Sequence, residues 1–344
     1  MQSLSTVNIT INLEKLKYNI QHSYALCKEK SVNLAVVTKS ICADSNIIEL
    51  INNTEISTIA DSRIDNFAKM STDKTRLLIR PSIPSESESV ICYSDASFQT
   101  ELATIKALGD AATSANKSHT ILIMVDLGDL RDGVMHTDKD SIITMAEYIH
   151  SHDYLKLGGV AANYNCFLGL QPDNDNMSIL AECYHMLKDY FDVDEPVVSG
   201  GNSSSVSLLA GSNIAIPDEI NQFRMGEAIM LGRDPADNTL IDGYNHDVFT
   251  LEVPLLEVHT KPIKNAPYTT MRRGVLSIGQ QDLQIAHILP VDERIKVLGS
   301  CSDECVIDLS DAPEYQTGDI VKFNLEYGAL MTAFAGSFIN KTYI

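Results

Sequence analysis

A single lysine, Lys39, follows a short apolar run over residues 33–37 that is rich in valine. A run of this length and composition is typical of a buried strand. A lysine at the end of such a strand is partly desolvated, which favours the neutral amine and suits a lysine that forms a Schiff base. A solvated lysine that opens the next loop is the alternative.

A glycine- and serine-rich segment, residues 200–205, precedes a predicted helix and forms a second candidate site. Glycines allow close backbone approach, serine hydroxyls donate hydrogen bonds, and a helix N-terminus favours an anion. The segment has neither the Gly-Lys-Ser/Thr of a Walker A loop nor a GxGxxG dinucleotide fingerprint. It predicts a phosphate cradle, with an ordinary helix cap as the alternative.

The elements around these residues alternate between strand and helix with short connections. We predict strands at residues 33–37, 56–60, 76–79, within 88–98, and at 120–125, 157–162, 196–199 and 220–223. Strands that alternate with helices predict a parallel sheet, and eight such units predict a closed (β/α)8 barrel of the TIM type, within the α/β class.

The strand ends of this barrel carry a set of polar residues. In such barrels the active site lies at the C-terminal ends of the strands. The residues predicted to lie there are Lys39, Arg131, Asn163, Ser203 and Arg224. A lysine and a phosphate cradle at the same rim indicate pyridoxal 5'-phosphate as the cofactor.

The alternation of strands and helices ends after residue 234, and strand-like runs then follow one another without helices. These runs are residues 248–258, 274–278, 295–298, 306–309 and 320–325. We therefore predict the barrel over residues 10–234 and a smaller C-terminal all-β domain over residues 235–344 that also includes residues 1–9.

Composition excludes several classes of protein. The formal charge of −20 argues against duplex binding, which requires a basic patch. The seven cysteines are odd in number and irregularly spaced, which is typical of a reducing compartment and predicts no metal site. Because the sequence shows no signal peptide and no long apolar run, we expect a cytoplasmic protein without a membrane partner.

Six motifs resemble those of the alanine-racemase-like, fold type III pyridoxal-phosphate enzymes, most closely the ornithine racemase branch. They are Val-Thr-Lys39, Val-Asp-Leu-Gly-Asp-Leu-Arg131-Asp-Gly, Ser-Gly-Gly-Asn-Ser203-Ser-Ser, Arg224-Met-Gly226-Glu-Ala-Ile-Met-Leu-Gly, Ile-Gly-Gln-Gln-Asp282 and Asn-Leu-Glu-Tyr327-Gly-Ala-Leu. The resemblance spans nearly the whole chain. It implies an amino-acid racemase, with ornithine or another basic amino acid as the small-molecule substrate, that acts as a head-to-tail homodimer.

The resemblance also implies roles for individual residues. Lys39 would form the Schiff base and act as one catalytic base. Arg131 resembles the arginine that contacts the phenolic oxygen of the cofactor, and Arg224 the arginine that faces its pyridine nitrogen. An arginine does not protonate that nitrogen, because the pKa of arginine exceeds about 12. The other residues of the predicted cofactor set are Asn163, Ser203, Ser204, Gly226, Glu227 and Tyr327.

Three positions depart from the alanine racemase pattern: Ala43 and Gln280 replace tyrosines, and Asn163 replaces a ring-stacking histidine. The tyrosine at the position of Gln280 is the second base in alanine racemases, and glutamine cannot transfer protons. The cysteine-x-aspartate element that the partner subunit supplies is present, so Cys301 or Asp303 is the candidate second base.

Several alternatives stay open. The same scaffold supports decarboxylases and D-amino-acid aldolases, and related single-barrel proteins bind pyridoxal phosphate without catalysis. Those single-barrel proteins lack the β-domain that this chain has. Arg131 could also form an ordinary loop ion pair with Asp129 or Asp132, and Cys301 could be a small buried residue.

Overall fold

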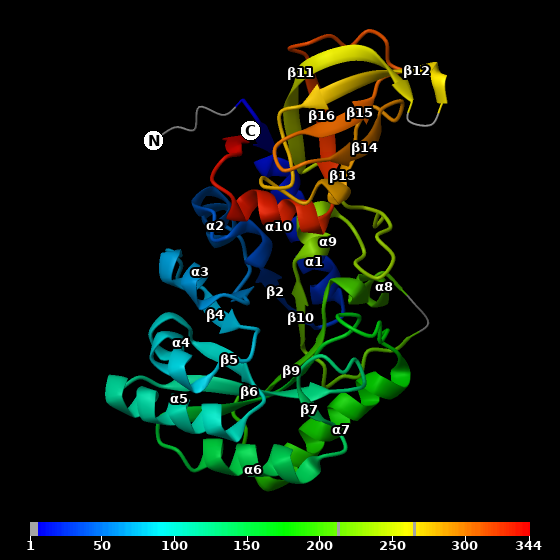
Figure 1. Ribbon diagram of the computed structural model, residues 1–344. Helices are drawn as coiled ribbons and strands as arrows, with labels where there is room; N and C mark the ends of the chain where they lie inside the picture. The colour runs from blue at the N-terminus through cyan, green and yellow to red at the C-terminus, as the bar shows by residue number, and fades with distance from the viewer. Residues whose placement is uncertain (1–5, 212–213, 264–265) are drawn as a thin grey trace. The chain divides into compact units, whose positions relative to one another are not determined.

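The computed structural model describes residues 6–211, 214–263 and 266–344, which fall into two compact units (Figure 1). The barrel unit contains Asn19–Lys39 and Ala43–Tyr244. The β unit contains the described residues up to Tyr18, together with Ser40–Cys42 and Asn245–Ile344. The domain limits given above stay a prediction.

The barrel unit is built on parallel strands. Within the described residues, eight of them close a ring in which β5 pairs with β6 and β10 pairs with β2. They are β2 (Asn33–Val37), β3 (Thr58–Asp61), β4 (Thr75–Leu78), β5 (Ala96–Gln99), β6 (His119–Asp126), β8 (Leu155–Ala162), β9 (Val197–Gly201) and β10 (Gln222–Met225). The short strand β7 (Val134–Met135) pairs with β6. The predicted (β/α)8 barrel is confirmed.

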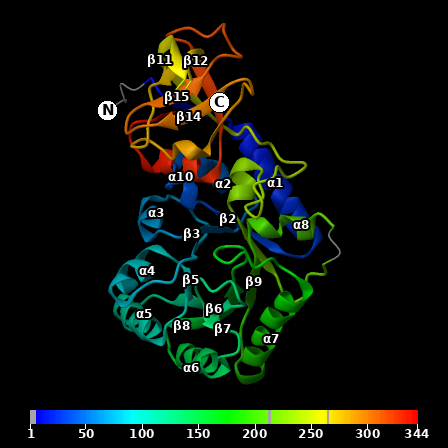
Figure 2. The ribbon, with the colours of Figure 1, turned by 45° about the vertical axis from the view of Figure 1, so that its right-hand side comes forward.

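Helices alternate with these strands. They are α1 (Leu13–Glu29), α2 (Ser45–Asn52), α3 (Ile64–Lys69), α4 (Ser87–Tyr93), α5 (Leu102–Ala115), α6 (Lys139–His150), α7 (Asn174–Tyr190), α8 (Val206–Leu209) and α9 (Glu227–Leu231). Figures 1 and 2 show α4, α5, α6 and α7 around the outside of the strands. In the described part of the chain, no helix is both long and apolar enough to cross a membrane.

The interior of the barrel is mostly apolar. Inward-facing side chains alternate along each strand and meet at the centre. A buried cluster there contains Ala35, Val37, Ala60, Leu77, Ala96, Phe98, Leu122, Met124 and Ala161. Arg224 of β10 is a buried charged residue beside this cluster and is hydrogen-bonded, as buried charges must be.

The β unit is a mostly antiparallel sheet. Its strands are β1 (Asn8–Ile11), β11 (Phe249–Ile263), β12 (Ala266–Leu276), β13 (Ile288–Pro290), β14 (Lys296–Ser300), β15 (Cys305–Asp308), β16 (Ile320–Leu325) and β17 (Asn340–Tyr343). The sheet runs β13-β16-β11-β12-β15-β14, and β1 pairs with β11 and β17. The predicted C-terminal β-domain is confirmed. The prediction has no helix here, whereas the structure has α10 (Tyr327–Ala335), which buries Leu330 and Phe334.

Candidate active site

Lys39 lies two residues beyond the end of β2 and begins a 3-10 turn, η1 (Lys39–Ile41). The residue between them, Thr38, fixes the start of this turn. Its backbone N–H donates to the carbonyl of Ala60 at 2.9 Å, and its hydroxyl donates to Asp61 Oδ2 at 2.9 Å. The turn is therefore anchored to the neighbouring strand β3, which holds the lysine at the C-terminal rim of the barrel.

The charge state of Lys39 is set by burial and by its charged neighbours. Burial lowers the pKa of Lys39 below its ordinary value, and Arg131 acts in the same direction. The thiol of Cys166 and the carboxylates of Asp61 and Glu227 oppose this shift. A lysine with a lowered pKa has more of the neutral amine that attacks an aldehyde.

Asp61 is a fully buried carboxylate at the end of β3. Besides the hydroxyl of Thr38, it accepts hydrogen bonds from Asn66 Nδ2 at 3.1 Å and from the backbone N–H of Arg63 at 2.9 Å. Burial raises the pKa of Asp61, and these hydrogen bonds act against that rise. The carboxylate places a fixed acidic group close to Lys39.

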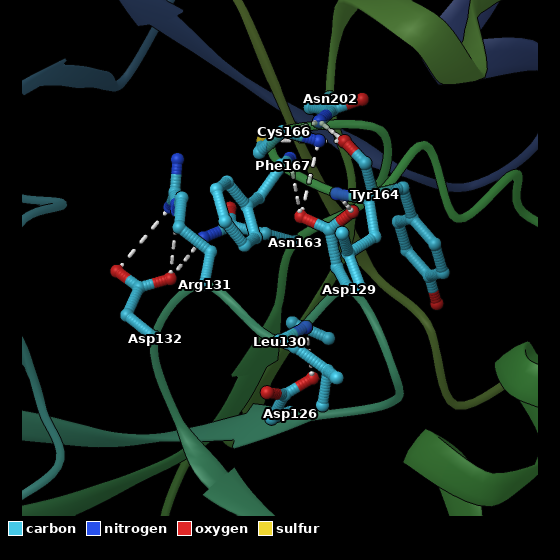
Figure 3. A network of polar contacts seen from close by, with 12 residues as sticks. Asp126, Asp129, Leu130, Arg131, Asp132, Asn163, Tyr164, Cys166, Phe167 and Asn202 are labelled. Atoms are coloured by element: carbon cyan, nitrogen blue, oxygen red, sulfur yellow. Dashed lines mark hydrogen bonds and ion pairs between the residues drawn. The ribbon is translucent and has the colours of Figure 1, made fainter.

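Arg131 follows β6 and forms an ion pair with its neighbour in sequence (Figure 3). Its Nε donates to Asp132 Oδ1 at 2.9 Å and its Nη2 to Asp132 Oδ2 at 3.2 Å. Of the two carboxylates considered from the sequence, Arg131 therefore uses Asp132. Asn163 Nδ2 donates to the same Asp132 Oδ1 at 3.0 Å.

Arg224 lies in β10 and is almost completely buried. Its Nη1 donates to the carbonyl and the hydroxyl of Ser199 at 3.0 and 2.7 Å. Its Nη2 donates to the carbonyl of Ala162 at 2.7 Å and to Asn163 Oδ1 at 3.0 Å. The guanidinium also lies over the ring of Phe98, 5.0 Å from its centroid. Burial lowers the pKa of Arg224 to about 10.

Asp129 organises the loop that follows β8. Its buried carboxylate accepts four backbone N–H groups: Oδ2 from Cys166 at 3.1 Å and Phe167 at 3.0 Å, and Oδ1 from Leu168 at 3.2 Å and Leu170 at 3.3 Å. Figure 3 shows this carboxylate enclosed by the loop. The contacts bring Cys166 close enough to Lys39, Arg131 and Arg224 to shift their pKa values.

The predicted phosphate cradle is assembled from β9 and β10. Asn202 precedes the turn η3 (Ser203–Ser205), and its Oδ1 accepts the backbone N–H of Ser204 at 3.1 Å. The hydroxyl oxygen of Ser203 accepts the N–H groups of Gly226 at 3.1 Å and of Ala228 at 3.3 Å. Ser203, Ser204, Gly226 and Glu227, which begins α9, therefore lie together.

Gly226 packs closely against β2. A Cβ at this position would lie 3.1 Å from Val37 Cβ and 3.2 Å from the Val37 carbonyl oxygen, so Val37 would have to move slightly to accept a larger residue. The backbone of the cradle therefore lies close to β2, the strand that leads to Lys39.

These barrel residues fit pyridoxal phosphate. The three cationic side chains Lys39, Arg131 and Arg224 are electrostatically coupled, which favours an anion among them. Ser203 uses its hydroxyl oxygen as an acceptor, so its hydrogen is available to an anionic oxygen. A neutral amine, an anion cradle and a buried arginine are the groups that this cofactor needs.

The remaining predicted residues lie in the β unit. Tyr327 is the first residue of α10. Cys301 is exposed, so it is not the small buried residue of the alternative, and its Sγ donates to Asp303 Oδ1 at 3.3 Å. This bond lowers the pKa of Asp303. The backbone N–H of Gln280 donates to the carbonyl of Cys301 at 3.0 Å, so the Gln280 and Cys301 loops are joined.

The sequence reasoning missed the roles of Asp129 and Cys166. Asp126, the last residue of β6, is followed by Asp129 and Asp132 at every third position. Acidic residues at this spacing from a strand end could have indicated their role. The position of Cys166 had no such signal, because it depends on hydrogen bonds to Asp129, a residue 37 positions away.

Comparison with known proteins gives three findings. The family model described as alanine racemase, N-terminal domain, matches residues 11–234. An ornithine racemase of Acetoanaerobium sticklandii is 37% identical, covering 97% of this chain and 98% of the relative; a lysine racemase of Thermotoga maritima is 27% identical with the same coverage. The solved alanine racemase of Bartonella henselae with covalently bound pyridoxal phosphate has a TM-score of 0.73 at 15% identity, covering 99% of this chain and 100% of that one.

Proposed function

The chain belongs to the alanine racemase family and is an amino-acid racemase, and we propose that it interconverts the enantiomers of ornithine with pyridoxal phosphate as its cofactor. The observation that carries the proposal is the cationic site at the barrel rim, where Lys39, Arg131 and Arg224 lie beside the Ser203 cradle. The names of the two relatives, an ornithine and a lysine racemase, support a basic amino acid as the substrate.

The barrel residues hold and orient the cofactor in this proposal. Lys39 would hold it covalently through Nζ, and Ser203, Ser204, Gly226 and Tyr327 would bind its phosphate. Arg224 would face the pyridine nitrogen and Arg131 the phenolic oxygen, with Asn163 and Glu227 in the same cofactor set. The bound cofactor supplies an electron sink that acidifies the Cα–H bond of the substrate. Because Arg224 keeps its proton, it does not protonate the pyridine nitrogen, and the electron sink stays moderate. A moderate sink favours return of the proton to Cα over the cleavage of other bonds.

Racemisation requires a proton-transfer group on each face of the substrate Cα. Lys39 Nζ serves one face. For the other face, we assign Cys301 as the proton carrier and Asp303 as the acceptor that orients its thiol, which agrees with their 3.3 Å hydrogen bond. Asp303 has a lowered pKa and stays ionised near neutral pH, whereas a thiol ordinarily carries a proton there.

The two groups come from different copies of the chain in this proposal. The Cys301 pair of one subunit completes the barrel site of the other in a head-to-tail homodimer. We also place the protein in the cytoplasm, which agrees with the odd number and irregular spacing of its seven cysteines.

Hydrogen exchange at the substrate Cα tests the reaction. The full-length protein is loaded with pyridoxal phosphate and incubated in D2O with L-ornithine, L-lysine or L-alanine. We expect exchange and D-isomer formation with ornithine fastest and alanine slowest. A decarboxylase would instead release carbon dioxide, an aldolase would act only on β-hydroxy amino acids, and a non-catalytic binding protein would show no exchange; each result would overturn the proposal.

A further inference from the structure

Asp132 is a charged residue of the site to which the proposed function gives no role. We propose that Asp132 is a positioning residue that, through Asn163, holds Arg131 and Arg224 in a fixed relation to each other across the site. The inference rests on the proposed function only in naming the cofactor that the two arginines contact.

The contacts form one continuous chain across the barrel rim, of which Figure 3 shows the part from Arg131 through Asp132 to Asn163. The carboxylate of Asp132 is bidentate with Arg131, at 2.9 and 3.2 Å, and its Oδ1 also accepts Asn163 Nδ2 at 3.0 Å. Asn163 Oδ1 in turn accepts Arg224 Nη2 at 3.0 Å. An arginine from the loop after β6 and an arginine from β10 are thus linked by two side chains.

The amide of Asn163 has only one orientation that satisfies both neighbours. A guanidinium only donates hydrogen bonds, and an ionised carboxylate only accepts them. The amide oxygen must therefore face Arg224 and the amide nitrogen must face Asp132. An aspartate at position 163 would place an oxygen against Asp132, and a leucine of similar size would satisfy neither neighbour.

Electrostatics gives a reason for this link. Burial lowers the pKa of Arg224, the charge of Arg131 acts in the same direction, and Asp132 opposes it. Burial also lowers the pKa of Arg131, but the hydrogen bonds to Asp132, together with the electrostatic effects of Cys166, Asp132 and Asp129, raise it overall. Two like charges that share a partly buried site need an anion between them, and Asp132 supplies it.

An ordinary loop ion pair is the rival explanation, and the chain contains a matched example. Arg76 and Asp95 form the same bidentate pair, with Nε–Oδ2 at 3.0 Å and Nη2–Oδ1 at 2.9 Å. The exposed fractions of its side chains, 24% and 38%, resemble the 36% and 23% of the Arg131–Asp132 pair. Arg76 and Asp95 lie at the N-terminal ends of β4 and β5, away from the strand ends that carry the site.

The first test measures the Kd for pyridoxal phosphate. The full-length chain is stripped of cofactor and titrated with pyridoxal phosphate, and binding is followed by the visible absorbance of the lysine-bound form. We expect Asp132→Asn and Asn163→Leu each to raise Kd about tenfold, as for the loss of one charge-assisted contact. When Arg131 is already replaced by lysine, Asp132→Asn should raise the Kd by less than about twofold further, because Asp132 acts through Arg131. The Kd of Asp95→Asn should stay near that of the wild type.

Three results of this test would overturn the inference: an unchanged Kd for Asp132→Asn, full additivity with Arg131→Lys, or an equal effect of Asp95→Asn. Thermal unfolding of each variant identifies any that fail to fold. In that case, Asp132→Glu, which keeps the charge on a longer side chain, replaces Asp132→Asn and should weaken binding by an intermediate factor.

A second readout needs no cofactor. Phenylglyoxal modifies arginine side chains, and peptide mass mapping of the stripped chain gives the rate at each one. Asp132→Asn should accelerate modification of Arg131 about two- to fivefold, the range expected for a half-exposed ion pair, whereas Asp95→Asn should accelerate only Arg76. If the wild type binds no pyridoxal phosphate, the proposed function fails, and this readout decides the inference through Asn163→Leu, which removes the hydrogen bond to Asp132 and should also accelerate modification of Arg131. An unchanged rate at Arg131 in Asn163→Leu or in Asp132→Asn overturns the inference.

Discussion

At the residue scale, the reactivity of Lys39 follows from its surroundings. In the proposed function, only the neutral amine of Lys39 can attach the cofactor, so the rate of attachment should rise with pH through the pKa of Lys39. Burial lowers this pKa below the ordinary value of 10.5. We therefore expect the stripped protein to reach its full attachment rate at a lower pH than an exposed lysine does, as measured by stopped-flow absorbance against pH.

The effect of Asp61 on the pKa of Lys39 can be tested separately, because its direction is known. Its carboxylate raises the pKa of Lys39, so Asp61→Asn should move the midpoint of the rate profile to lower pH. The amide oxygen can accept the backbone N–H of Arg63 while the N–H₂ group donates to the Thr38 hydroxyl, whose own hydrogen can go to the carbonyl of Ala60, which limits structural damage. Asp95→Asn is the control and should leave the midpoint unchanged. A wild-type midpoint at 10.5, or an upward shift in Asp61→Asn, would contradict the role of burial and of Asp61.

Cys301, the proposed second proton-transfer residue, can be tested by a single substitution. Cys301→Ala should leave the cofactor absorbance unchanged, because Lys39 is intact. Starting from the two ornithine enantiomers separately in D2O, exchange from one of them should fall by about 10²- to 10⁴-fold, the range for loss of an acid–base group. Cys92, another exposed thiol, provides the control variant Cys92→Ala. Equal exchange from both enantiomers in Cys301→Ala would remove Cys301 as a base.

The sequence predicted which residues lie at the rim, but not how they pair. Asp129 and Asp132 are equally plausible partners of Arg131 in the sequence. Between them, Leu130 adopts a left-handed backbone conformation with φ of 53°, which a leucine does not signal. Asp132 then pairs with Arg131, whereas Asp129 is buried under the loop that follows β8.

At the element scale, this loop depends on one carboxylate. The N–H groups of residues 166, 167, 168 and 170 all donate to Asp129. Asn in its place keeps one acceptor oxygen and turns an N–H₂ group towards two of these donors. Asp129→Asn should therefore lower the free energy of unfolding by about 2–4 kcal/mol. Hydrogen–deuterium exchange should become faster at these four amides.

A matched control for Asp129 is the carboxylate that caps α2. Asp44 accepts the N–H groups of Asn46 and Ile47, and asparagine is an equally good residue at such a cap. Asp44→Asn should therefore change stability by less than about 0.5 kcal/mol. If Asp129→Asn were as mild, with unchanged exchange over residues 165–170, the loop would not depend on that carboxylate.

The order of elements was predictable because alternating strands and helices leave a clear apolar pattern. The weakest prediction concerned residues 88–98, where β5 is only four residues long and buried on both faces. Such a strand shows no alternation and cannot be distinguished from a buried helix by periodicity. Helix α10 was not predicted because its sequence, YGALMTAFA, is apolar almost throughout and has no helical alternation of apolar and polar residues.

At the scale of the whole molecule, the proposed reaction divides its two proton-transfer groups between the units. Lys39 belongs to the barrel unit and Cys301 to the β unit. If the β unit of one copy completes the barrel site of another, each site in a dimer takes Lys39 from one chain and Cys301 from the other. Defects in the two residues can then complement each other when they are carried on different chains.

Mixing Lys39→Ala and Cys301→Ala chains tests this division. In a mixed dimer, one site combines both defects and the other has Lys39 and Cys301 intact. Random reassociation after mild denaturation gives half mixed dimers, so about one quarter of the wild-type racemase activity should return. If both groups came from one chain, every site in the mixture would lack one of them and no activity would return. Mixing either variant with itself is the control, and an active monomer in sedimentation would contradict the shared site directly.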